Sequence, residues 1–488
     1  MLAVAYAVYL ALLVLIGYLA FRRNEDLSDF LLGGRSLGAW SCGLSAGASD
    51  MGAWLVLSLP GLAMTTGFHV LWLVIGLLIG MWLNWLFVAR RLRVYSELAG
   101  DALTIPAYLD DRFEDNSRLI RLISSLAILG FMLLYTSAGL LAVGQLLSGV
   151  FDWDLHMAII AATLAVTAYS VLGGFLAVSC SDVFQALLVL AALLAVPLAL
   201  IGSADQLEMH FSALQAANPA LVDLFSNPEG KSISAVGIVS LAVWGLGYFG
   251  QPHVLARFQA ISSKNKIIWA RFIAVSWGAL VMVGACLTGL LALIILPETF
   301  TDTDGVLVAM LNVVFSPWVA GILSLAVLAA IMSSVDSQLM VAASTLAEDC
   351  NRLFLDQQAD DGLSANVGRI AVFLLVILAA WLAIDRQADI LEYVAYAWAG
   401  LGATFGPVIL LSLYWPLMNR TGAVAGMLTG AVTVIVWRQL EGGWFDVYEL
   451  LPGIVLATVS AIVMSKLLGP PSKSVRWMFA KVQVKLRD

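Results

Sequence analysis

Long apolar runs recur along the chain, separated by short polar segments. A membrane-spanning helix needs about 20 mostly apolar residues, and several runs exceed this length, which indicates tilted or interrupted helices. We predict thirteen spans, which cover residues 1–22, 41–67, 69–93, 120–149, 156–176, 181–203, 234–256, 268–297, 314–347, 367–384, 390–415, 422–438 and 448–469. The pattern predicts an all-α integral membrane protein.

The composition supports this prediction. Hydrophobic residues make up 61% of the 488 positions, and charged residues make up only 12%. A water-soluble protein could not bury so much apolar surface, and a disordered chain would be far more polar, so both classes are excluded. We expect a chain surrounded by the lipid bilayer, with no enzymatic activity, no nucleic acid and no obligate protein partner.

The basic residues predict the orientation. With the N-terminus outside, every Lys and Arg except Lys231, Arg386 and Arg438 falls in an inner segment, which is 22 of 25. Cytoplasmic loops are enriched in Lys and Arg, so the N-terminus is expected outside the plasma (inner) membrane and the C-terminus in the cytoplasm. The outer segment 204–233 is expected to form a short cap, and the inner segment 94–119 a short helix.

Two predicted spans are rich in glycine and proline. Segment 41–67 contains Pro60 and several glycines around Asp50, and segment 234–256 contains Pro252 and several glycines. Such residues interrupt a helix, and the freed backbone groups are tolerated where they line a buried polar site. Interrupted spans at matching places in two halves indicate a transporter's binding site. The alternative is that the glycines only allow close helix packing.

Five spans counted from each interrupted helix form two sets of opposite orientation, because each set has an odd number of helices. The predicted organisation has an extra N-terminal helix at 1–22, a first five-helix repeat at 41–203, an inverted second repeat at 234–415, two C-terminal helices at 422–470 and a basic tail at 471–488. The tail is amphipathic and is expected to lie on the anionic inner leaflet.

Three acidic residues fall at membrane depth, namely Asp50, Asp182 and Asp336. A charged side chain there costs about 2.5–3.5 kcal/mol on insertion scales, so each is a functional candidate. Structural alternatives stay open for all three. Asp50 could serve as a hydrogen-bonding group, Asp182 as the N-cap of the next helix, and Asp336 as a solvated residue of an inner vestibule.

A small cluster of oxygen donors is predicted beside Asp336. Ala330, Ser333 and Ser334 have the i, i+3, i+4 spacing of one helix face, and Ser337 continues that face. Two hydroxyls and a carbonyl near unwound backbone form an oxygen-only site, which suits Na⁺ better than a transition metal. The alternative is that these serines only bond carbonyls of their own helix.

Several stretches resemble the sodium:solute symporter family. They are GRSLGAW at 34–40, ASDMGAW at 48–54, LTIPAYLDDRFED at 103–115, GGFLAVSCSD at 173–182, WGLGYFGQPHVLARF at 244–258, AAIMSSVDSQL at 329–339 and YAWAGLGATFGP at 396–407. Within the family, the GYFGQPH stretch resembles the proline branch. The resemblance implies the leucine-transporter-type fold of two inverted five-helix repeats, and Na⁺-coupled uptake of L-proline by alternating access.

The resemblance also implies a sodium site. Its ligands would be the backbone carbonyls of Ala48, Met51 and Ala330 and the hydroxyls of Ser333 and Ser334. Asp50 matches an Asp implicated in sodium-dependent function. The set of Asp182, Ser333, Asp336 and Ser337 resembles a second sodium site of some relatives. Asp336 stands where those relatives have a hydroxyl residue, which argues against a second coupled ion, and Gly52-Ala53 replaces a Ser-Gly pair at the substrate pocket.

An apolar wall around the proline ring is expected from Trp54, Tyr135, Trp244, Tyr248 and Pro252, with Trp398 as a possible outer gate. Aromatic residues in membrane helices also serve as interfacial belts or as packing. Other functions stay open. The chain could carry another small amino acid or an organic acid, or act as a membrane sensor. A channel would need a continuous polar pore, whereas the acidic residues here are few and separated.

Overall fold

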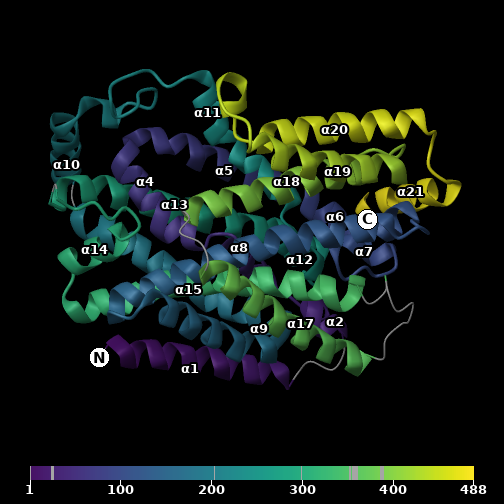
Figure 1. The fold of residues 1–488 in the computed structure, drawn as a ribbon, viewed down its shortest axis with the longest axis horizontal. Coiled ribbons are helices and arrows are strands. Elements are labelled where there is room, and N and C mark those ends of the chain that lie inside the picture. The colour runs from purple at the N-terminus through teal and green to yellow at the C-terminus, as the bar shows by residue number, and fades with distance from the viewer. Residues whose placement is uncertain are drawn as a thin grey trace.

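The computed structural model of the chain describes residues 2–22, 27–202, 204–297, 299–350, 353, 361–384 and 390–487. Within these ranges the regular structure is helical, and the only β-type contacts are isolated bridges between Leu37 and Ile261 and between Ser226 and Ser232. Most helices run along the long axis of the molecule, with the N-terminus and the C-terminal helix α21 (Lys473–Arg487) toward opposite ends (Figure 1).

Most predicted spans correspond to long helices. These are α1 (Leu2–Phe21), α5 (Leu71–Asn84) continued by η4 (Trp85–Ala89) and α6 (Arg90–Leu98), α8 (Leu119–Phe151), α9 (Leu155–Leu200), α13 (Ile267–Ile295), α15 (Pro317–Ser344) continued by η8 (Thr345–Cys350), α17 (Asp361–Ile384), α18 (Ile390–Tyr414), α19 (Arg420–Trp437) and α20 (Leu450–Leu467). Ten stretches in the described residues are long and apolar enough to cross a membrane, and one of them, Trp54–Leu98, runs on for 45 residues. The chain is therefore a multi-pass membrane protein, and the count of thirteen spans stays a prediction.

Both glycine- and proline-rich spans are interrupted, as predicted. The first consists of α3 (Ala39–Ala48), a non-helical turn, η2 (Trp54–Ser58) and α4 (Leu59–Thr66). The second consists of α11 (Ala235–Ala242), the 3₁₀ segment η6 (Val243–Gly250) and α12 (Pro252–Ala260). Gln251 is extended between η6 and α12, because the ring of Pro252 disfavours a helical conformation at the preceding residue.

Glycines bring the second interrupted helix close to α5. A Cβ atom on Gly245 would lie 1.9 Å from the carbonyl oxygen of Gly76, and one on Gly80 would lie 2.0 Å from the carbonyl oxygen of Gly245. The two backbones therefore touch directly, as small residues allow in membrane helices. This contact packs the 3₁₀ segment η6 against α5.

The break in α9 differs from the prediction. We expected a connecting segment between spans 156–176 and 181–203, whereas the helix bends at Gly174, where φ is 62° and ψ is −165°. Glycine adopts this backbone conformation without steric cost. Asp182 consequently lies well inside the second half of α9, so the N-cap alternative for Asp182 is wrong.

The polar segments carry short helices. They are α2 (Leu27–Leu32), η1 (Gly33–Arg35), η3 (Gly67–Val70), α7 (Ile105–Phe113), α10 (Ala204–Ala217), η5 (Pro219–Val222), η7 (Lys264–Lys266), α14 (Val306–Val314) and η9 (Gly443–Asp446). The helix expected in segment 94–119 is α7, and its N-cap Thr104 accepts a hydrogen bond from the backbone N–H of Ala107 at 3.1 Å. Segment 204–233, which is predicted to lie outside, holds α10 and η5, and the tail forms the amphipathic helix α21.

Candidate ion- and substrate-binding site

The turn between α3 and η2 packs against the middle of α15. The Ser334 hydroxyl donates to the carbonyl oxygen of Ala48, the last residue of α3, across 3.4 Å. A Cβ atom on Gly52 would lie 2.3 Å from Ser334 Oγ and 3.5 Å from the carbonyl oxygen of Ala330. The Ser334 hydroxyl thus reaches the interrupted helix, in contrast to the alternative that it serves only its own helix. Ala48, Ala330 and Ser334 are brought together, and all three are buried.

The other two predicted sodium ligands lie near this contact but are placed differently. Met51 is fully buried in the turn, and its side chain reaches α13, where a Cβ atom on Gly278 would lie 3.1 Å from Met51 Cε. The Ser333 hydroxyl donates to Asp182 Oδ1 at 2.5 Å. Ser333 therefore joins the predicted sodium site to the buried acid of α9.

Asp50 lies at the centre of a buried polar group. The hydroxyl of Tyr248, on η6, donates to Asp50 Oδ2 at 2.6 Å. Nε2 of His253 lies 3.9 Å from Asp50 Oδ1. The backbone carbonyl of Asp50 accepts the indole N–H of Trp54 at 2.9 Å and faces the Tyr135 hydroxyl at 3.5 Å. Asp50 thereby connects both interrupted helices to α8.

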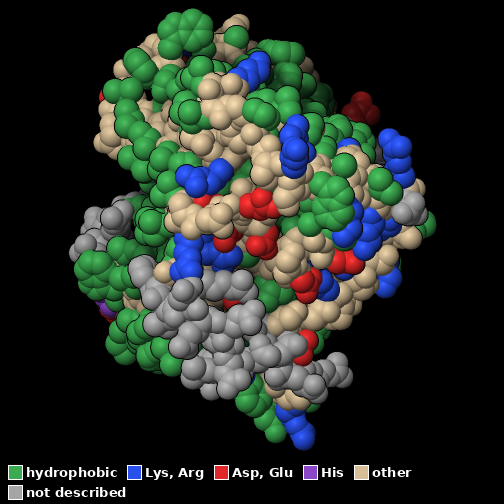
Figure 2. Space-filling model, turned by 90° about the vertical axis from the view of Figure 1, so that its right-hand side faces the viewer, with side chains coloured by type: hydrophobic (Ala, Val, Ile, Leu, Met, Phe, Trp, Pro, Cys, Tyr) green, Lys and Arg blue, Asp and Glu red, His purple; other side chains and the backbone are tan. Residues whose placement is uncertain are grey.

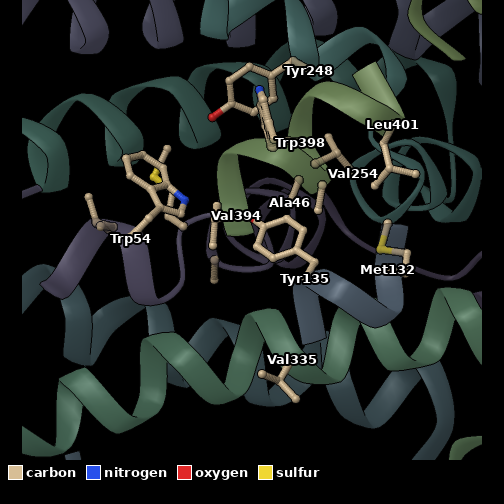
Figure 3. Close-up of a cluster of buried hydrophobic side chains, with 14 of the residues drawn as sticks. Ala46, Trp54, Met132, Tyr135, Tyr248, Val254, Val335, Val394, Trp398 and Leu401 are labelled. Atoms are coloured by element: carbon tan, nitrogen blue, oxygen red, sulfur yellow. The ribbon is translucent and has the colours of Figure 1, made fainter. Parts of the chain in front are cut away.

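Four of the six predicted aromatic and proline residues gather near Asp50. Trp54, Tyr135, Tyr248 and Trp398 come from four different elements and are all buried (Figure 3). The rings of Tyr248 and Trp398 meet edge to face, with their centroids 5.0 Å apart. Because these side chains exclude solvent, the region between the two interrupted helices is closed in this conformation.

Trp244 and Pro252 are oriented away from this group. The indole of Trp244 stacks on Tyr448 with ring centroids 5.0 Å apart, and only its backbone carbonyl accepts the Trp398 indole N–H, at 2.9 Å. Pro252 lines a cleft together with Thr104 and Gln259. Residues of α2, α7, α12 and α15 line this cleft.

Asp182 is held in a buried ion pair. Nη2 of Arg257, on α12, lies 3.3 Å from Asp182 Oδ2, and the Ser45 hydroxyl donates to the same oxygen at 2.6 Å. Arg257 also donates from Nη2 to the Ser337 hydroxyl at 2.6 Å. All four side chains are fully buried. A guanidinium group therefore supplies the positive charge beside the residues that resemble a second sodium site.

Asp336 has a hydrogen-bond partner of its own on α9. Its Oδ1 accepts the Ser170 hydroxyl of α9 at 2.7 Å, and the side chain is fully buried. The alternative of a solvated vestibule residue is therefore wrong for Asp336 in this conformation. Arg257 joins Asp182 to Ser337, Ser333 donates directly to Asp182, and Asp336 accepts the hydroxyl of Ser170.

Arg257 and His253 were missed as site residues. Arg257 was counted among the basic residues of the inner segments, whereas α12 continues through Ala260 and buries it completely. The i, i+4 spacing of His253 and Arg257 would place both on one helix face, and this was the available signal. The Nη1 atom of Arg257 donates to the carbonyl oxygen of His253 at 2.9 Å.

Comparisons with known proteins agree with this architecture. The model of the sodium:solute symporter family matches residues 30–430. The high-affinity proline transporter PutP of Bacillus subtilis is 42% identical over 474 residues, which cover 96% of this chain and 99% of the relative. The sodium/proline symporter of Salmonella typhimurium is 40% identical over 485 residues, which cover 98% of this chain and 95% of the relative.

Two solved structures share the fold. A Na⁺-coupled sialic acid symporter in a substrate-bound outward-open state aligns with a TM-score of 0.80 at 19% identity, covering 96% of this chain and 98% of that one. Mhp1, a nucleobase-cation-symport-1 family transporter in a closed conformation, aligns with a TM-score of 0.59 at 12% identity, covering 94% of this chain and 99% of that one. The expected leucine-transporter-type fold is confirmed. The family match and the two relatives show that this chain belongs to the sodium:solute symporter family.

Proposed function

We propose that this chain carries L-proline into the cell together with Na⁺ by alternating access, and that it catalyses no chemical reaction. Full-length similarity to relatives named as proline transporters supports this substrate. The single observation that carries the mechanism is the packing of the turn after Ala48 against Ala330 and Ser334, beside the Asp50–Tyr248 hydrogen bond. An ion held there would fix the same turn that carries Asp50.

The ion is proposed to bind at the junction of α3, η2 and α15. The carbonyls of Ala48, Met51 and Ala330 and the hydroxyl of Ser334 are neutral oxygen donors, which suit Na⁺. Ser333 would contribute a further oxygen while it holds Asp182. Since Arg257 already supplies a cation beside Asp182, the arrangement favours one coupled Na⁺ for each proline.

The substrate is proposed to bind between the two interrupted helices, beside Trp54, Tyr135 and Tyr248. Proline is a compact ring that loses little conformational freedom on binding, so a small aromatic pocket suits it. Longer amino acids would clash or would need ordering. Trp398, in edge contact with Tyr248, would close the pocket from one side. The indole of Trp244, stacked on Tyr448, would support Trp398 through its backbone carbonyl.

The proposed organisation keeps the predicted boundaries, with repeats at 41–203 and 234–415 rocking against each other. A sodium gradient would drive this movement. One charge crossing 100 mV supplies about 2.3 kcal/mol, and a tenfold Na⁺ gradient adds about 1.4 kcal/mol. Together they would sustain on the order of 500-fold accumulation of proline for one-to-one coupling.

The test of this function is uptake of labelled L-proline by proteoliposomes. We expect saturable uptake with a Na⁺ gradient and almost none when choline replaces Na⁺. Unlabelled proline should compete, whereas longer amino acids, sugars and carboxylic acids should not. Competition by one of these instead would identify another substrate in the same family, and non-saturable flux would indicate a channel.

The hydroxyl of Ser334 provides a sharper test of the ion site. Ser334→Ala removes the oxygen ligand that α15 presents to the turn. We expect about a tenfold rise in the Na⁺ concentration for half-maximal uptake, because the lost contact is worth about as much as one hydrogen bond. Ser324→Ala is the matched control, because Ser324 is also buried on α15 but donates to the carbonyl oxygen of Gly321 in its own helix. Equal Na⁺ dependence of the two variants would place the ion elsewhere.

The orientation is proposed from the 22-to-3 division of basic residues, with the N-terminus outside and α21 in the cytoplasm of a cell whose inner membrane holds the protein. We expect a cysteine introduced at Ser474, an exposed position of α21, to react with a membrane-impermeant maleimide only in inside-out vesicles. A cysteine at Ser212, exposed on α10, should react only in intact cells. The reverse labelling pattern would show that the orientation is inverted.

A further inference from the structure

The C-terminal helix α21 is packed on one side and open on the other. Val475, Phe479 and Val482 are buried, and the hydroxyl of Ser472 and the ammonium of Lys485 bind Glu114 and Glu97 at 2.9 and 3.0 Å. These contacts fix α21 against α6 and α7. The helix lies at the end of the molecule that Figure 2 faces, where Lys and Arg side chains are spread over the surface.

The open side of α21 forms a basic hollow with η7. The hollow is lined by Lys264, Trp477, Ala480, Lys481, Val484 and Lys485, and none of these six residues is acidic. The ammonium of Lys264 donates to the carbonyl oxygen of Lys485 at 2.5 Å, so η7 and α21 form the walls of one site. The Lys481 ammonium lies 5.2 Å from the centre of the Trp477 ring, and 61% of Trp477 is exposed.

Exposed aromatic residues follow Lys264 closely in the chain. The segment η7, which begins at Lys264, leads directly into α13, and the first two turns of α13 present Trp269 and Phe272, which are 65% and 66% exposed. Exposed indole and phenyl rings just beyond lysines are typical of the level where lipid headgroups meet acyl chains. The basic side chains and the exposed aromatic rings therefore match the two parts of a phospholipid. The phosphate would lie at the lysines, and an acyl chain would lie along α13.

We infer that this basic hollow, defined by Lys264, Trp477, Lys481 and Lys485, binds the phosphate headgroup of an anionic phospholipid. Lys264 and Lys481 would bind the phosphate oxygens, and Trp477 would lie at the headgroup level. Lys485 is engaged by Glu97 and would hold the wall of the site. An anionic lipid bound here would tie α21 and η7 to the bilayer.

Native mass spectrometry of the purified full-length protein tests this inference. The protein in neutral detergent is titrated with phosphatidylglycerol, with phosphatidylcholine, and with inorganic phosphate as a competitor. We expect Lys264→Gln/Lys481→Gln to weaken retention of phosphatidylglycerol about 30-fold, since each lysine near an anionic surface contributes about a factor of five. Lys231→Gln, an exposed lysine on the outer segment, is the matched control and should retain the lipid fully.

Two results would overturn the inference. One is equal retention of phosphatidylglycerol by the double variant and the unmodified protein, with both eluting as the same folded species in gel filtration. The other is displacement of the lipid by inorganic phosphate at equal concentration, which would show a site for free anions. Retention that is lost in the double variant, kept in Lys231→Gln and insensitive to phosphate supports the lipid site.

Discussion

Replacing Asp50 by Asn is expected to raise the Na⁺ concentration for half-maximal proline uptake by about 30-fold, in a protein that still folds and inserts. The substitution preserves the shape of the side chain and removes its charge. Two unit charges about 4 Å apart interact by about 4 kcal/mol at an effective dielectric constant of about 20, and the interaction falls with distance, so a carboxylate in the turn that would hold the ion contributes on the order of 2 kcal/mol. The Asp50 carboxylate is fully buried between the two interrupted helices, so water screens it little.

The variant Tyr248→Phe distinguishes the effect of the Asp50 charge from the effect of its hydrogen bond to Tyr248. This variant keeps the carboxylate and removes the hydroxyl that donates to it at 2.6 Å. We expect weaker proline binding, with a much smaller change in Na⁺ dependence than in Asp50→Asn. The measurement is calorimetric titration of Na⁺ and then of proline. If Asp50→Asn bound Na⁺ with unchanged affinity, the carboxylate would have only a structural role.

The fold was largely predictable because its causes are local in the sequence. Apolar runs define the helices, and the prolines at Pro60 and Pro252 lie at the starts of α4 and α12, after the interruptions. The break at Gly174 was placed a few residues late. In the sequence, Gly173-Gly174 also fits close helix packing, and only the backbone angles distinguish a packing glycine from a hinge.

The site was less predictable because its contacts join residues far apart in the chain. Asp50 and Tyr248 were both identified, but their hydrogen bond spans 198 positions and no pattern in the sequence pairs them. The stacking of Trp244 on Tyr448 is likewise a contact between residues far apart in the chain, and no pattern in the sequence pairs them. Arg257 was missed because a basic residue at the end of an apolar span fits a cytoplasmic loop, and its burial depends on Asp182 of a distant helix.

Removing either partner of the Asp182–Arg257 pair is expected to destabilise the protein by about 3–5 kcal/mol, because the remaining charge would be buried without compensation. The pair is fully buried, with 3.3 Å between Arg257 Nη2 and Asp182 Oδ2. Asp182→Asn and Arg257→Gln should each lower the melting temperature by several degrees. The double variant should recover much of this loss, since it buries no unpaired charge.

An exposed ion pair supplies the comparison. Glu392, 58% exposed, pairs with Arg438, and Glu392→Gln should change the melting temperature very little because surface pairs contribute about 0–1 kcal/mol. Melting is followed by circular dichroism in the same detergent for all variants. Equal losses in the double variant and in the sum of the two single variants would mean that the two charges do not interact. Recovery in the double variant would instead show that the charges of Asp182 and Arg257 compensate each other. Because Arg257 already balances the charge of Asp182, a second coupled cation beside Asp182 is disfavoured while Arg257 remains charged.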